Sequence, residues 1–238
     1  MRRRKLLSVI LALSLCLTLP LGMAAAEEPA GTATEVKTSE ALTTALADSA
    51  VETVRLGTNI EISASLAVSR TVTLDLNGCV LKMTGDGSVI YVADKGHLKL
   101  TDSTPTAEHK FTPDENGLWA LDETNGTKTV KGGVITGGTG SHSGIDAYGG
   151  GVYVANGGEF TMTGGSIAGC TVRATATGRA YGGGVFVAEE HGKFTMCGGS
   201  ITGCAAVGAS FSFGGGIHNE GTTRLSGRAE IRDCHAKD

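Results

Sequence analysis

Carboxylates and histidines are the residues from which a hydrolase or lyase site would be built in this 238-residue chain. Such chemistry needs two acids close together, or an acid and a base, with a cation to hold an acidic substrate. Residues 27–238 contain neither an adjacent Asp pair nor an Asp at a fixed interval; His191 lies in a predicted turn, and His218 aligns with the aromatic residues Tyr153 and Phe186 of the repeat. The acids of the C-terminal half are scattered through predicted turns: Asp146, Glu159, Glu189, Glu190, Glu220 and Glu230. We therefore expect no catalytic residues.

Cysteine is the other reactive residue type, and three copies of it recur along the chain. Cys170, Cys204 and Cys234 each follow a similar apolar segment, whereas Cys79 and Cys197 stand outside this series. No C-x-x-C motif occurs, and identical residues in a line do not form a tetrahedron, so we expect no metal and no cofactor. Stacked cysteines can form a disulfide in an oxidising compartment, but parallel side chains favour a column of buried thiols.

The single tryptophan, Trp119, is the strongest candidate for ligand binding. It lies with Phe111 in residues 103–131, which interrupt the pattern of the rest of the chain. Residues 109–112 and 118–121 flank Pro113-Asp114-Glu115-Asn116-Gly117, which predicts a protruding β-hairpin in which the two rings face each other. An exposed Trp119 would stack on sugar rings. The alternative, which we favour, is that both rings pack the hairpin against its neighbours.

The strands that would position these residues are predicted from a repeat in the sequence. Residues 148–170 read YGGGVYVANGGEFTMTGGSIAGC, and residues 181–204 read YGGGVFVAEEHGKFTMCGGSITGC. A weaker copy begins at Phe213. Short β-prone words bounded by glycines predict strands and tight turns without helical periodicity. One copy cannot bury its own apolar face, so the copies should stack with like residues above one another, and residues 171–180 should form a loop between copies.

Residues 53–100 fit the same plan with less regularity. Short alternating segments are separated by turn signals such as Asn77-Gly78, and Val72, Leu74 and Leu76 should face inward while Thr73 and Asp75 face outward. Residues 39–50 predict a short amphipathic helix that begins at Ser39 and Glu40. We expect this helix, within an N-terminal segment of residues 27–52, to cap the first strands. Its apolar stripe contains Ala41, Leu42, Ala45 and Leu46.

The words YGGGVYV, FTMTGGSI and TLDLNG resemble the repeats of right-handed parallel β-helix proteins that bacteria export, a fold shared with pectate lyases. Many of these proteins are large, adhesin-like surface proteins. The GGGI/V element is also similar to the repeat of chlamydial polymorphic outer-membrane proteins. The resemblance extends from about Val54 onward, and it implies an all-β solenoid without implying an activity. In such repeats an Asn usually follows the short segment that contains the Ile, whereas this chain has Cys170, Cys204 and Cys234 after Ile167, Ile201 and Ile231.

The N-terminus predicts export. Residues 1–26 contain four basic residues, an apolar run and the small-residue site Ala24-Ala25-Ala26, which is typical of a signal peptide. An uncleaved membrane anchor is the alternative, because the apolar stretch is long enough to span a bilayer. After cleavage, 16 Lys and Arg face 24 Asp and Glu, a net charge of −8, which argues against nucleic acid as a partner. No later segment predicts membrane insertion.

The repeat has a predicted cap at its N-terminal end only. The third copy stops just after Cys234, where another glycine triplet is due, and solenoids need a polar terminal unit. We therefore expect the chain to be a fragment of a longer protein. The alternative is that residues 235–238 fold over the last strands.

These observations predict an all-β, right-handed parallel β-helix over residues 53–238, with a short N-terminal capping helix and a hairpin insertion at residues 103–131. We expect a secreted or cell-surface protein that acts as a rigid stalk or adhesin-like binding module. Its partners would be glycans or components of a host or cell-wall surface, with Trp119 and Phe111 as ligand-binding residues. The alternative is a polysaccharide lyase or glycoside hydrolase that acts on acidic polysaccharide.

Overall fold

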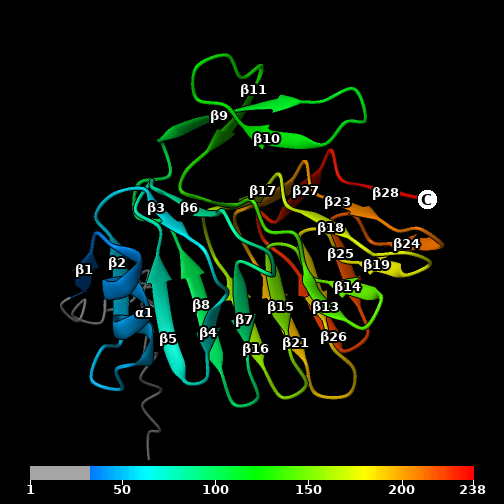
Figure 1. The fold of residues 1–238 in the computed structure, drawn as a ribbon. Coiled ribbons are helices and arrows are strands. Elements are labelled where there is room, and N and C mark those ends of the chain that lie inside the picture. Colours follow the sequence, from blue (N-terminus) through cyan, green and yellow to red (C-terminus); the bar gives the residue numbers. More distant parts are fainter. Residues whose placement is uncertain (1–32) are drawn as a thin grey trace, which may run out of the picture. The chain divides into compact units, whose positions relative to one another are not determined.

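The computed structural model describes residues 33–238 (Figure 1). The predicted signal peptide and its cleavage site lie outside the described residues. The described part is an all-β structure with a single α-helix, and its large sheets are built from parallel strands. The all-β class predicted from the sequence is therefore confirmed.

Three large parallel sheets, A, B and C, carry most of the chain. Sheet A contains, in spatial order, β1 (Thr34–Val36), β2 (Thr53–Leu56), β5 (Thr71–Asp75), β8 (His97–Thr101), β16 (Glu159–Met162), β21 (Lys193–Met196) and β26 (Thr222–Leu225). Sheet B contains β27 (Glu230–Arg232), β22 (Ser200–Thr202), β17 (Ser166–Ala168), β12 (Val134–Thr136), β6 (Val80–Met83) and β3 (Ile60–Ile62). Sheet C contains β25 (Ile217–Asn219), β20 (Val185–Val187), β15 (Val152–Val154), β7 (Ile90–Val92) and β4 (Leu66–Val68).

Three smaller sheets complete the structure. Sheet D is antiparallel and contains β10 (Trp119–Leu121), β9 (Glu108–Pro113) and β11 (Lys128–Lys131). Sheet E contains β13 (Ser141–Ser143), β14 (Asp146–Tyr148), β19 (Arg179–Tyr181) and β24 (Phe211–Phe213), and only its β13–β14 pair is antiparallel. Sheet F contains the parallel strands β18 (Thr171–Arg173), β23 (Ala205–Val207) and β28 (His235–Lys237).

In the C-terminal half, the chain visits the sheets in a fixed order. From β15 it runs through sheets A, B, F and E and returns to sheet C at β20, and we call each such circuit a pass. Val152 pairs with Val185, Phe160 with Phe194 and Ile167 with Ile201, so like residues stack as the repeat predicts. The two phenyl rings are stacked with their centroids 5.0 Å apart. This register makes continuous columns of buried side chains.

Residues 171–180, predicted as a loop, contain a strand and the start of another. β18 pairs in parallel with β23 of sheet F and β19 with β24 of sheet E, so this prediction was wrong. Three-residue strands separated by a turn leave too short an alternation to recognise in one copy. Sheet E carries Tyr148, Tyr181 and Phe213 in one aromatic column, and Tyr148 also meets Phe186 of sheet C edge to face at 4.9 Å. These aromatic contacts hold sheet E against sheet C.

The predicted helix is α1 (Ser39–Ala47), which is three residues shorter than expected. Its N-cap is Thr38 rather than Ser39, because the Thr38 hydroxyl accepts a hydrogen bond from the Ala41 N–H at 3.1 Å. Leu42 and Leu46 are buried in the main core, and the helix packs on β1, β2, β3 and β4. α1 therefore covers the first strands, as predicted, together with β1, which the sequence did not reveal.

The last strands are the least covered part of the described residues. Leu225 is 51% exposed and Ile231 is 41% exposed, although both continue columns that are buried in earlier passes. β28 pairs with β23 in parallel register, so residues 235–237 extend the stack and do not fold over it. The folded-tail alternative was therefore wrong. Within residues 33–238, no helix combines the length and apolar character that a membrane span requires.

Candidate functional site

The insertion at residues 103–131 forms the wall of the candidate site. The predicted hairpin is present as β9 and β10, and a third strand, β11, which the sequence did not reveal, pairs with the other edge of β9. Figure 1 shows sheet D standing apart from the stacked sheets, on the side of sheet B. The insertion connects β8 of sheet A to β12 of sheet B, so it projects from the corner between these sheets.

Trp119 and Phe111 pack this insertion against the stacked strands. Phe111 is fully buried, Trp119 is 6% exposed, and their ring centroids lie 6.2 Å apart. They form a small core with Val130, Val134 and Ala168. Neither residue presents an exposed ring face, so the geometry supports the packing alternative and does not support sugar stacking on Trp119.

Two glycines provide the surface on which these aromatics rest. A Cβ atom added to Gly203 would overlap the Trp119 indole, and one added to Gly169 would lie 3.1 Å from the Phe111 ring. Both glycines have positive φ angles, +61° at Gly169 and +58° at Gly203. The glycines of Gly169-Cys170 and Gly203-Cys204 therefore form turns and also leave room for the aromatic side chains of the insertion.

Polar contacts fix the base of the insertion. The two ring nitrogens of His109 lie 2.7 Å from the Glu123 carboxylate and 2.9 Å from the Gly78 carbonyl oxygen. Asp102 accepts hydrogen bonds from the N–H groups of Gly78 at 2.7 Å and Gly133 at 2.8 Å. The Asp102 carboxylate therefore holds the turn at Gly78 and the segment at Gly133 together, next to the start of the insertion at residue 103.

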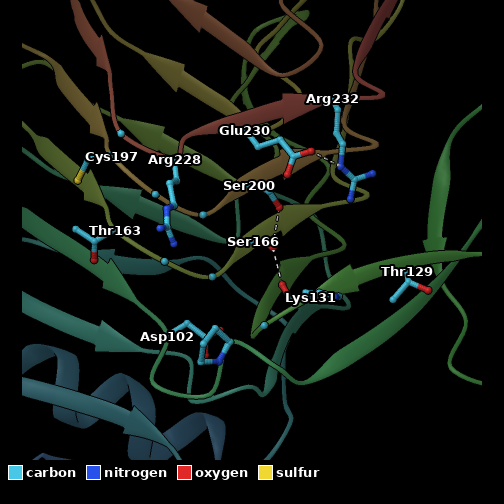
Figure 2. Close-up of a pocket in the computed structure, with 17 residues that line it drawn as sticks. Asp102, Thr129, Lys131, Thr163, Ser166, Cys197, Ser200, Arg228, Glu230 and Arg232 are labelled. Carbon is cyan, nitrogen blue, oxygen red and sulfur yellow. Dashed lines mark hydrogen bonds and ion pairs between the residues drawn. The ribbon is translucent and has the colours of Figure 1, made fainter.

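A groove of 820 Å³ lies between the insertion and the corner that joins sheets A and B. Figure 2 shows this groove with its lining side chains. Its floor is made by the same turn in consecutive passes, and its lining contains Asp102, Pro105, Thr129, Lys131, Gly132, Thr163, Gly164, Gly165, Ser166, Cys197, Gly198, Gly199, Ser200, Gly227, Arg228, Glu230 and Arg232. A Cβ atom at Gly198 or Gly227 would lie 2.5 Å from a backbone oxygen of the preceding turn, so these glycines let the turns of the floor stack closely.

The hydroxyl groups of the floor form a short chain. The Ser166 and Ser200 hydroxyl oxygens lie 2.8 Å apart, and the Ser166 hydroxyl donates to the Lys131 carbonyl oxygen at 3.1 Å. With that donor used, the proton between the two hydroxyls comes from Ser200. The Ser200 oxygen consequently keeps lone pairs that can accept a hydrogen bond from a ligand.

The third copy of the repeat brings charge to this groove. In register, Glu230 follows Ser166 and Ser200, and Arg228 stands in a turn that is glycine-rich in the earlier passes. Glu230 forms an ion pair of 3.0 Å with Arg232, which also contacts Asp233 at 3.0 Å. Arg228 and Lys131 form no ion pair with any residue in the range 33–238. The replacement of Gly-Gly-Ser by Arg-Ala-Glu is the sequence signal that would have revealed this site.

The scattered acids of the sequence remain scattered in the structure. Asp146 pairs with Arg179 at 2.8 Å, and this guanidinium lowers the pKa of the Asp146 carboxyl. Glu159 pairs with Lys193, which lowers the pKa of Glu159 in the same way. Glu220 contacts His218 at 3.3 Å, and Glu190 lies beside His191 at 3.7 Å. No three metal-ligating side chains of the described residues gather at one point.

The cysteines of the described residues are free thiols. Cys170 and Cys204 are completely buried in consecutive passes, and Cys234 continues the same column. Burial raises the pKa of the Cys204 thiol well above its usual value, and the Cys204 contact together with burial raises the pKa of Cys234. This agrees with the predicted column of thiols and not with a disulfide. Cys197 is exposed at the edge of the groove.

Comparison with protein-family models, curated proteins and solved structures found no match to this chain. The groove therefore has to be interpreted from its own chemistry. It combines two cations without an acidic partner in residues 33–238, a hydroxyl acceptor and a glycine-rich floor, and its acids Asp102 and Glu230 already have hydrogen-bond or ion-pair partners. Such a site can hold a polar ligand by hydrogen bonds and charge.

Proposed function

We propose that this chain is an exported, right-handed parallel β-helix that acts as a non-catalytic binding module or rigid stalk at a cell surface. The stacking of like residues in consecutive passes supports the β-helix. The predicted signal peptide supports export. The ligand surface would be the groove beside the insertion, and glycans of a host or cell wall would be the ligands.

The single observation that carries the binding role is the state of the groove acids. Asp102 is engaged by backbone N–H groups of Gly78 and Gly133, and Glu230 is engaged by Arg232. A general acid or base needs a carboxyl group free to exchange a proton with the substrate. The groove thus offers cations and a hydroxyl for recognition without an unengaged carboxylate for catalysis.

Rigidity follows from the same architecture. Each pass contacts its neighbours through parallel strands in three large sheets, and the apolar columns are continuous. A structure of this kind would hold the insertion and groove at a fixed distance from any attachment point. This is the behaviour required of a stalk or display scaffold.

The alternative is a lyase or hydrolase that acts on acidic polysaccharide, because Asp102 and Glu230 share the groove with three basic residues. A glycan array and a product assay on the same purified protein separate the two functions. We expect retention of one or more glycans without release of reducing ends or unsaturated products. Product formation that is lost in the Glu230→Gln variant would refute the binding role, and an array without any retained glycan would refute glycan binding.

A further inference from the structure

We infer that the groove recognises the anionic groups of an acidic glycan, and that Arg228 and Lys131 are the residues that bind them. This inference rests on the proposed function, since it names the ligand class for the same groove. It follows from the charge, the geometry and the hydrogen-bonding state of the lining residues.

The first argument is the contrast between the groove and the rest of the protein. Residues 27–238 carry a net charge of −8, so an anionic ligand is repelled by most of the surface. The groove lining reverses this balance, with Lys131, Arg228 and Arg232 against Asp102 and Glu230. An acidic polymer would therefore be directed to this face of the molecule.

The second argument is that two of the three cations are available. The charge of Arg232 is already matched by Glu230 and Asp233, whereas Arg228 and Lys131 have no acidic partner among the residues that the structure describes. Figure 2 shows the Arg228 side chain reaching toward the groove floor, where Thr163 and Ser166 lie. Guanidinium donors arranged as a planar fork bind a carboxylate or sulfate with two parallel hydrogen bonds.

The third argument is the shape of the floor. The lining comes from four consecutive strand levels of the stack, at Asp102, Thr163, Cys197 and Gly227. At about 4.8 Å per level the floor spans roughly 14 Å. Small residues line it at the last three levels, with Gly164, Gly198 and Gly227 beside Thr163 and Cys197, so an extended chain can lie along it. The Ser200 hydroxyl would accept a hydrogen bond from a sugar hydroxyl group.

The test compares acidic polymers with neutral polymers of the same backbone. Binding of the full chain to polygalacturonate and to its fully methyl-esterified form is measured by calorimetry, and dextran sulfate and dextran form a second pair. We expect the acidic member of one pair to bind at least tenfold more tightly. Preference within the first pair identifies a carboxylate ligand, and preference within the second identifies a sulfate ligand.

Three variants assign the effect to the groove. We expect Arg228→Gln and Lys131→Gln each to weaken binding of the acidic polymer about tenfold or more, which corresponds to the loss of one charge-assisted contact. Arg224→Gln is the matched control, because Arg224 is an exposed arginine of the neighbouring strand β26 that does not line the groove. It should change the affinity less than twofold. Trp119 fluorescence verifies that each variant keeps its fold.

The possible failures are distinct. Equal binding of acidic and neutral polymers, or equal effects of Arg228→Gln and Arg224→Gln, would overturn the inference while leaving glycan binding intact. Failure to bind any polymer or any glycan on the array would overturn the proposed function itself.

Discussion

The position of the insertion on the glycine column can be tested with one substitution at Gly203. In the structure the Trp119 indole lies directly on Gly203, so that a Cβ atom at this position would overlap the ring. We predict that Gly203→Ala lifts the tip of the insertion away from sheet B. Trp119 is the single tryptophan of the chain, so tryptophan fluorescence reports on the surroundings of this one side chain.

The expected loss of stability has two parts. An alanine at a φ of +58° costs about 1 kcal/mol, because its Cβ atom approaches the following carbonyl oxygen. Loss of the buried environment of Trp119, which is 6% exposed, costs about 2–3 kcal/mol more. We therefore expect Gly203→Ala to lower the free energy of unfolding by about 3–4 kcal/mol.

Gly144→Ala is the matched control. Gly144 has a φ of +64°, but no atom lies within 4 Å of the position that its Cβ would occupy. This variant has the same backbone strain without the contact to a ring, and should lose about 1 kcal/mol. Asp233 stands at the position of Gly203 in the next pass with a φ of +53°, so a side chain is accommodated in this conformation where the ring is absent.

The assay is urea unfolding followed by tryptophan emission and by circular dichroism. Native Gly203→Ala should emit at longer wavelength than the wild-type protein and should be quenched more strongly by acrylamide, whereas Gly144→Ala should match the wild type in both. The reasoning is refuted if the two variants lose equal stability and the native emission of Gly203→Ala is unchanged.

Three further predictions concern the core, the pH dependence and the base of the insertion. Phe194→Ala should cost about 3–5 kcal/mol in urea unfolding, because Phe194 is fully buried in a stack with Phe160; a cost below about 1 kcal/mol would contradict the stacked column. Burial by itself would raise the pKa of Asp75, but the Arg55 guanidinium and the N–H groups of Ser103 and Asn77 lower it overall. The stability that this carboxylate contributes should therefore be complete above about pH 4 and should disappear as the pH falls through the lowered pKa. Asp75→Asn should consequently have a lower free energy of unfolding than the wild type at pH 7, and the two values should converge in acid. A constant difference from pH 7 to pH 2.5 would argue against this assignment. His109→Ala should cost about 1–3 kcal/mol by leaving the Gly78 carbonyl and Glu123 without their partner, and hydrogen exchange should locate the loss in β9 and β11; uniform exchange throughout the protein would contradict it.

The strands and their register could be predicted because the same pattern of apolar residues and glycines occurs in more than one copy of the repeat. Val152, Phe160 and Ile167 find their counterparts by alignment of one copy with the next, and stacking then follows from the need to bury each apolar face. The same reasoning located the helix, since capping and amphipathic spacing are local properties. The sequence prediction succeeded for the helix and for the strands with strongly apolar segments, whereas the three-residue strands β18 and β19 were mistaken for a loop.

It was wrong where burial depends on a partner that alignment does not identify. Asp75 was expected to face outward because it alternates with Leu74, yet it is 2% exposed and bonded to Arg55 and Ser103. Arg55 belongs to the preceding strand of sheet A, and Ser103 begins the insertion. A buried carboxylate is acceptable only with such donors, and their positions become visible only when the chain is folded.

The groove was missed for a related reason, and its origin suggests where function lies in a protein of this kind. The repeat produces the columns, the glycine turns and the floor, which recur between the pass of β16 and β17 and the pass of β21 and β22. The wall is the insertion, which occurs once, and the charges are Arg228 and Glu230, which occupy places where the earlier copies have Gly-Gly-Ser. A residue that departs from the repeat is not required by the stacking of the core, so the fold alone does not account for it. The departures that meet in one groove are therefore the residues at which binding should be sought first.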